Sequence, residues 1–169
     1  MYNILLTLYN ICVFKKGPQD IEYSTSNLKL LAIINVTISL LTLYMLTDLF
    51  KALLQALLSL TLLVFFSWMS LYLHHKMARF NQTTSSLVGT DAIIGFIGIP
   101  MTATMLTGQS GLLVFLLMIG LMVWHWAIIG HIMRNALEQN MVFSYGLALL
   151  YLIFAYKITD LLFTIGIEG

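Results

Sequence analysis

The chain has 169 residues, of which 60% are hydrophobic and 9% charged, and its formal net charge is +1. An average soluble domain carries about 25% charged residues and presents a largely polar exterior, so this composition excludes a soluble globular fold and predicts an integral membrane protein. The near-neutral charge excludes nucleic acid as a partner, and the single cysteine, Cys12, excludes an internal disulfide and a cysteine-based metal site.

Residues 1–16 begin with an apolar segment that is too short to cross about 30 Å of hydrocarbon. Asn3, Thr7 and Asn10 recur at spacings of four and three residues, which places a polar stripe on an otherwise apolar helix. This pattern predicts an interfacial amphipathic helix that lies in the membrane plane. The alternative is a segment packed under the helical bundle.

Five longer apolar segments follow, and each is long enough to span a bilayer at about 1.5 Å per residue. They are predicted at about residues 28–47, 52–73, 87–107, 112–133 and 141–163. The polar stretch from Phe80 to Ser86 is expected to be a loop, and Gly108 to Gly111 a tight turn. The predicted fold is a single all-α integral membrane domain, residues 1–169, with five transmembrane helices after the N-terminal interfacial amphipathic helix.

Basic residues indicate the orientation. The side that holds the N-terminus and the loops after the second and fourth spans carries six basic residues, and the other side carries two. The first group is Lys15, Lys16, Lys29, Lys76, Arg79 and Arg134, and the second is Lys51 and Lys157. The positive-inside bias therefore predicts a cytoplasmic N-terminus and a C-terminus on the periplasmic side.

Two stripes inside the spans form the candidate site. The fourth span carries Gly120, Trp124, His131 and Arg134 on one face, and the third carries Asp91, Gly95 and Gly98. Such small and polar faces predict that the two helices pack together. An intramembrane carboxylate costs about 2.5 to 3.5 kcal/mol on insertion scales, so Asp91 is expected to pair with His131, Arg134 or both. His125 is expected to point away from this face.

The polar cluster has two interpretations. It is either a proton relay or substrate-binding group, or a structural contact that fixes how the third and fourth spans pack. A haem site formed by His74 or His75 with a histidine of the fourth span is geometrically allowed, but the histidine spacings match no metal motif and no cofactor is expected. The sequence contains no recognisable catalytic constellation, so no enzymatic activity is expected.

Three stretches carry a resemblance to known proteins: Phe14 to Ser24 (FKKGPQDIEYS), Gly89 to Pro100 (GTDAIIGFIGIP) and His131 to Glu138 (HIMRNALE). Together with five spans, they resemble small bacterial inner-membrane proteins of unassigned function that are similar to the Yip-type family. The DLYGP-type signature of that family's eukaryotic branch is missing. The resemblance implies a bacterial cytoplasmic-membrane location and a non-catalytic role, and it implies no catalytic residues.

The leading functional hypothesis is a non-enzymatic accessory or scaffold subunit of a membrane complex, because packing faces are present without catalytic chemistry. Its expected partners are the lipid bilayer and either another membrane protein or further copies of the chain. One alternative is a small transporter or proton-pathway component that uses Asp91, His125, His131 and Arg134. Another alternative is a redox or quinone-linked membrane subunit.

Overall fold

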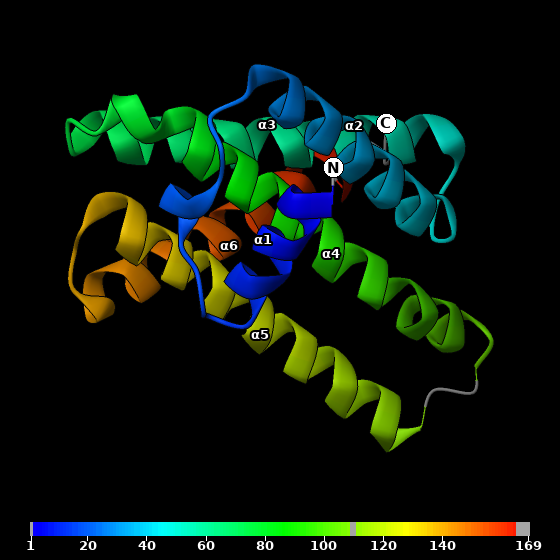
Figure 1. Cartoon of the computed structure of the whole chain (residues 1–169). Helices are drawn as coiled ribbons and strands as arrows, with labels where there is room; N and C mark the ends of the chain where they lie inside the picture. Colours follow the sequence, from blue (N-terminus) through cyan, green and yellow to red (C-terminus); the bar gives the residue numbers. More distant parts are fainter. Residues whose placement is uncertain (1, 109–110, 165–169) are drawn as a thin grey trace.

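The computed structural model describes residues 2–108 and 111–164, so the centre of the predicted turn at Gly108 to Gly111 lies outside the described residues. Within these ranges five helices are long and apolar enough to cross a membrane, which confirms the predicted all-α membrane bundle (Figure 1). They are α2 (Thr25–Tyr44), α3 (Leu49–Leu73), α4 (Phe80–Leu106), α5 (Leu112–Leu137) and α6 (Met141–Thr164), and the shorter α1 (Tyr2–Cys12) precedes them.

The two ends of the bundle differ in charge. α2, α4 and α6 begin, and α3 and α5 end, at what we call the basic end, which carries Lys76, Arg79 and Arg134. The opposite end, here the far end, carries the turn between α2 and α3. There the Asp48 side chain accepts a hydrogen bond from the Lys51 N–H at 3.1 Å and caps α3. The cytoplasmic location of the basic end stays a prediction.

The third spanning helix begins earlier than predicted. α4 starts at Phe80, and the stretch expected to be a polar loop forms its first turns. Its hydroxyl residues are at most 1% exposed: Thr83, Thr84, Ser85 and Ser86. The Thr84 hydroxyl bonds that of Ser67 on α3 at 2.8 Å, and the Ser86 hydroxyl donates to the Gln82 carbonyl at 2.8 Å. The Thr83 and Ser85 hydroxyls are buried without a hydrogen-bond partner. The polar stretch is therefore a buried part of the bundle, and Thr84 joins it to α3.

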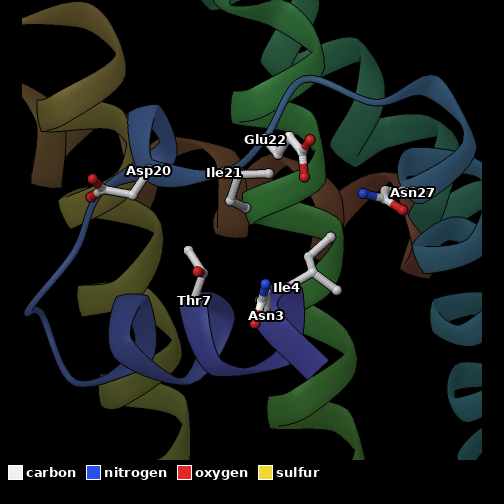
Figure 2. Close-up of a pocket in the computed structure, with 7 residues that line it drawn as sticks. All are labelled: Asn3, Ile4, Thr7, Asp20, Ile21, Glu22 and Asn27. Atoms are coloured by element: carbon white, nitrogen blue, oxygen red, sulfur yellow. The ribbon is translucent and has the colours of Figure 1, made fainter. Parts of the chain in front are cut away.

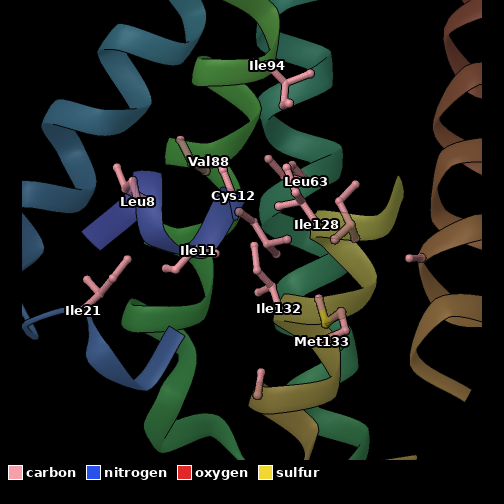
Figure 3. Packing of buried hydrophobic residues seen from close by; sticks show 14 of the residues in the cluster. Leu8, Ile11, Cys12, Ile21, Leu63, Val88, Ile94, Ile128, Ile132 and Met133 are labelled. Carbon is pink, nitrogen blue, oxygen red and sulfur yellow. The ribbon is translucent and has the colours of Figure 1, made fainter. Parts of the chain in front are cut away.

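α4 occupies the centre of the fold and packs against α1, α2, α3 and α5. Buried apolar side chains fill the space between these helices (Figure 3). Val88 and Ile94 contribute from α4, Leu63 from α3, and Ile128 and Ile132 from α5. The core is concentrated toward the basic end, where α1 also joins it.

α1 packs against α4 and α5 and runs across both of them (Figure 2). Leu8, Ile11 and Cys12 are at most 1% exposed on its inner face. Its outer face exposes apolar side chains, among them Leu5 and Tyr9 at 51% and 60%. α1 is therefore part of the bundle, as the alternative interpretation expects. Its transverse course and outer apolar face also suit the expected helix in the membrane plane.

Candidate functional site: an Asp–His pair inside the bundle

Asp91 on α4 and His125 on α5 form the central polar contact. The Asp91 Oδ1 atom lies 3.1 Å from the His125 Nε2 atom. Asn35 on α2 donates from Nδ2 to the second carboxylate oxygen, Asp91 Oδ2, at 2.8 Å, and to the Val88 carbonyl at 3.3 Å. Because Asn35 is only 1% exposed, its amide is fixed in place. Three helices therefore hold one carboxylate, and each of its oxygens has a polar partner.

The pair lies near the middle of the bundle. Asp91 comes eleven residues after the first residue of α4, and His125 comes twelve residues before the last residue of α5. At about 1.5 Å per residue, both lie roughly 16 to 18 Å from the basic end of their helices. His131 lies only about 9 Å from the end of α5 by the same measure. The predicted pairing of Asp91 with His131 or Arg134 is wrong, because the early start of α4 carries Asp91 to the depth of His125.

His131 and Trp124 fasten the N-terminal segment instead. The His131 Nε2 atom bonds the Lys16 carbonyl at 2.9 Å, and since a carbonyl only accepts, the proton lies on Nε2. The His131 ring also packs edge-on against Phe14, with ring centroids 5.3 Å apart. Trp124 Nε1 donates to the Cys12 carbonyl at 3.0 Å. The face of α5 that was predicted to meet α4 therefore holds α1 and the turn that follows it.

A cavity of about 420 Å³ opens beside the Asp91–His125 pair and extends toward the far end. The Asp91 and His125 side chains are 30% and 21% exposed, so the pair is open to this cavity. Most of the polar lining comes from α2, α3 and α6: Ser39, Thr42, Ser59, Tyr151, Tyr156 and Thr159. A second cavity of about 260 Å³ shares Tyr156 and Thr159 and reaches Gln55 and Asp160.

Toward the basic end, the surroundings of the pair are closely packed. The side chains on this side belong to α3, α4 and α5 and are at most 1% exposed: Leu71, Leu87, Val88, Ile129 and Ile132. Buried hydroxyl residues lie on the same stretches of α3 and α4, among them Ser67, Thr84 and Thr90. The pair is therefore open to the cavity on one side and enclosed by buried side chains on the side of the basic end.

The glycines predicted to mediate packing have different roles. A Cβ on Gly98 would lie 3.5 Å from Leu121 on α5, so this glycine faces α5, the helix against which it was predicted to pack. A Cβ on Gly95 would lie 3.2 Å from Ile38, so Gly95 packs against α2. Gly120 has no atom within 4 Å of such a Cβ, so it lies on an open face of α5 and its predicted packing role is wrong.

The closest approaches occur at two glycines that the stripes did not identify. A Cβ on Gly130 would lie 2.8 Å from Cγ of the Tyr145 ring on α6, and one on Gly89 would lie 2.7 Å from the end of Leu8 on α1. Tyr145 also accepts a hydrogen bond at its carbonyl from Trp126 Nε1 at 2.9 Å. Gly130 and Gly89 therefore set the spacing of α5 to α6 and of α4 to α1.

The sequence also did not predict a group of ion pairs at the basic end, here called the clasp, which Glu138, Lys76 and Arg79 form. Glu138, which ends α5 in a left-handed conformation with φ of 54°, forms ion pairs with Lys76 and Arg79. Arg79 also donates to the Ala136 carbonyl at 3.2 Å and so satisfies the end of α5. These two hydrogen-bond donors lower the pKa of the Glu138 carboxyl, Lys76 having the larger effect. Arg134, in contrast, is exposed.

The remaining histidines lie at the basic end. The His74 ring packs beside Phe143 with centroids 5.4 Å apart, and His75 ends α3 with a positive φ of 55°. In the part of the chain that the structure describes, no group of three or more His, Cys, Asp or Glu side chains is arranged to hold a metal ion.

Comparisons with protein families, with curated proteins and with solved structures find no match to this chain. The resemblance to small Yip-type membrane proteins therefore stays a prediction. The basis for a function is the chemistry of the site itself: a carboxylate and an imidazole lie together inside a bundle of apolar helices, beside a cavity with hydroxyl side chains in its wall.

Proposed function

We propose that this protein moves protons within the membrane, as a small transporter or as a proton-pathway component, and that Asp91 and His125 take up and release them. One observation carries the proposal: the pair lies at mid-bundle and opens to a cavity whose largely apolar wall carries several hydroxyl side chains. Ionisable groups inside membrane segments are costly and commonly mark ion or proton pathways. A contact that only fixed helix packing would gain nothing from an open cavity beside it.

The chemistry of the pair suits a proton. An imidazole nitrogen can accept or donate a proton, and the Asp91 carboxylate lies 3.1 Å from the His125 ring, within reach of a proton held between the two groups. Asn35 holds the carboxylate toward His125 by occupying its second oxygen. Along the cavity, the hydroxyls of Ser59 and Thr159 offer hydrogen-bond partners to water, which can carry protons between the pair and the far end.

The test is proton flux in liposomes that contain the purified full chain and a pH-sensitive dye. A potassium gradient with a potassium ionophore imposes a membrane potential, and the internal pH is followed. We expect faster pH changes than in protein-free liposomes, with no dependence on sodium. Flux equal to that of protein-free liposomes at both signs of the potential would contradict the proposal.

A separate observation favours a second function, the accessory or scaffold subunit. From Leu112 to Ala127 of α5 no residue is buried, and Gly120 faces open space. A lightly packed helix half with a small residue offers a surface to another membrane helix. Purification in a gentle detergent distinguishes this function: a stable partner or dimer that requires this face supports it, and a lone monomer contradicts it.

A further inference from the structure

A polar cavity of about 290 Å³ lies at the basic end, between α1 and the segment that leads into α2 (Figure 2). Its polar lining consists of Asn3 and Thr7 from α1, Asp20 and Glu22 from the connecting segment, and Asn27 from the first turn of α2. Two isoleucines complete the wall. The cavity holds far more than one water molecule, whose share of liquid volume is about 30 Å³. It shares no lining residue with the cavity beside Asp91.

Thr7 indicates that this cavity receives a hydrogen-bonding ligand. Its side chain points into the cavity in Figure 2, and the residue is only 9% exposed. Among the residues that the structure describes, the Thr7 hydroxyl has no hydrogen-bond partner. The Thr7 oxygen is not among the fully buried hydroxyls without a partner, which belong to Thr83 and Ser85, so it is accessible from the cavity. A ligand inside the cavity can therefore form a hydrogen bond with it.

The charge of the lining selects a cation. Asp20 and Glu22 are both acidic, and no basic side chain lines the cavity. The Asp20 Oδ2 atom already accepts the Gly17 N–H at 2.8 Å, and the two carboxylates lie at separate parts of the rim in Figure 2. A calcium ion needs six or more oxygens around one point. An ammonium group, with three donors that reach separate acceptors, fits this arrangement better.

The surroundings select a lipid. The outer face of α1 beside the cavity exposes Leu5, Leu6 and Tyr9, which suits contact with acyl chains. Asn27 lies in the first turn of α2, where the helix N-terminus favours a negatively charged group such as a phosphate. A phosphate and an ammonium joined by a short linker and attached to acyl chains make up an aminophospholipid.

We propose that this cavity binds the headgroup of phosphatidylethanolamine. Glu22 and Asp20 hold the ammonium group, Thr7 and Asn3 complete its hydrogen bonds, and the phosphate lies near Asn27. The site is independent of proton movement at Asp91 and His125. It gives α1 a role as a lipid-contacting element beside its packing in the bundle.

The test measures which lipids the purified full chain retains. The protein is reconstituted in nanodiscs with equal amounts of phosphatidylethanolamine, phosphatidylcholine and phosphatidylglycerol, extracted in gentle detergent, and its bound lipid is quantified by mass spectrometry. We expect about tenfold enrichment of phosphatidylethanolamine, since hydrogen bonds to charged groups contribute free energies of this size. Phosphatidylcholine is the informative competitor, because its methylated ammonium cannot donate hydrogen bonds.

Two variants locate the binding. Glu22→Gln removes the charge and Thr7→Val removes only the hydroxyl, so both should abolish the enrichment. Thr37→Val is the matched control, because the Thr37 hydroxyl is exposed and donates to the carbonyl of Ile33 in its own helix. A thermal unfolding curve like that of the wild type shows that a variant is folded, and Thr7→Val, which is nearly isosteric, carries the test where Glu22→Gln does not fold.

Three results would overturn the proposal. These are equal retention of the three lipids, enrichment of phosphatidylglycerol, and binding of calcium that displaces the retained lipid. Binding of soluble O-phosphoethanolamine without enrichment of the lipid would assign the cavity to a free ligand and overturn its assignment to a membrane lipid.

Discussion

The Asn35 amide on α2 and the Asp91 carboxylate on α4 are joined by a hydrogen bond of 2.8 Å, although the two residues are 56 positions apart. The bond occupies one carboxylate oxygen and leaves the other directed at His125. Asn35 is thereby a positioning residue: it touches the group that we propose to bind the proton, and it sets the orientation of that group.

Replacing Asn35 with leucine tests this role. Asn35→Leu keeps the branched shape of the side chain but leaves one Asp91 oxygen without a partner, at a cost of about 1–3 kcal/mol. We expect proton flux to fall about tenfold and its pH dependence to shift, because the carboxylate is no longer held toward His125. Flux is measured over a series of pH values in liposomes. A folded variant with lower flux and an unchanged pH profile would reduce Asn35 to a packing role.

Gly130 should tolerate no side chain. In Gly130→Ala the new Cβ would lie 2.8 Å from the Tyr145 ring, so α5 and α6 must separate or the ring must move. Overpacking of this kind costs about 1–3 kcal/mol, from which about 1 kcal/mol of gained helix propensity is subtracted. We expect a lower thermal midpoint in detergent. Gly146→Ala is the control, because it meets no atom within 4 Å and should be neutral or stabilising.

The clasp formed by Glu138, Lys76 and Arg79 should stabilise the protein in a pH-dependent way. Hydrogen bonds from Lys76 and Arg79 lower the pKa of Glu138 below its ordinary value of 4.5. A carboxyl with a lower pKa in the folded state stabilises fully above the ordinary value and loses this effect as the pH falls through the lowered one. Glu138→Gln should therefore unfold at a lower temperature than wild type at neutral pH.

The same comparison in acid supplies the control for the Glu138 prediction. As the pH falls below 4.5 and through the lowered pKa of the folded protein, the wild-type carboxyl becomes protonated and resembles the amide of the variant. The difference in thermal midpoint should then narrow. A difference that stays constant from neutral to acidic pH would show that Glu138 contributes through its shape at the end of α5 and not through its charge.

Cys12 reports whether α1 is docked. It is the single cysteine of the chain, it is 1% exposed, and burial raises the pKa of its thiol to about 11. Because the thiolate is the reactive form, a soluble thiol reagent should modify the folded protein very slowly at neutral pH. Trp124→Phe removes the hydrogen bond to the Cys12 carbonyl and should accelerate the reaction several-fold.

Trp68→Phe is the matched control for the Cys12 measurement. Trp68 lies on α3, is 42% exposed and stacks on Tyr72, so it has no direct part in holding α1. Its replacement should leave the labelling rate of Cys12 unchanged. Rapid labelling of the wild-type protein would contradict the docking of α1 against α4 and α5.

The number and type of spanning helices could be predicted from the sequence, because long apolar segments have one stable arrangement in a bilayer. The residue at which α4 begins could not be predicted. The stretch from Phe80 to Ser86 has the composition of a loop, and only its neighbours in space, such as Ser67, show that its hydroxyls are buried. Small polar residues indicate either a loop or a helix contact, and local pattern does not distinguish the two.

Only part of the candidate site could be predicted, because its partners also depend on contacts between helices. Asp91 is identifiable as an intramembrane carboxylate that needs a partner, whichever residue supplies it. Which of His125, His131 and Arg134 pairs with Asp91 depends on which of them lies at the same depth in the bundle. That depth depends on the residue at which α4 begins. The role of Asn35 depends on which face of α2 meets α4, and the weak polar stripe of that helix does not determine it.

The most direct test of the proposed function is the proton flux of Asp91→Asn compared with that of wild type. The asparagine keeps the size of the side chain but cannot carry the negative charge that stabilises a protonated His125. We expect the flux to fall to the level of protein-free liposomes, while Asp48→Asn, which alters an exposed helix cap at the far end, keeps the wild-type rate. Wild-type flux through a folded Asp91→Asn protein would contradict the assignment of Asp91 and His125 as the proton-binding pair.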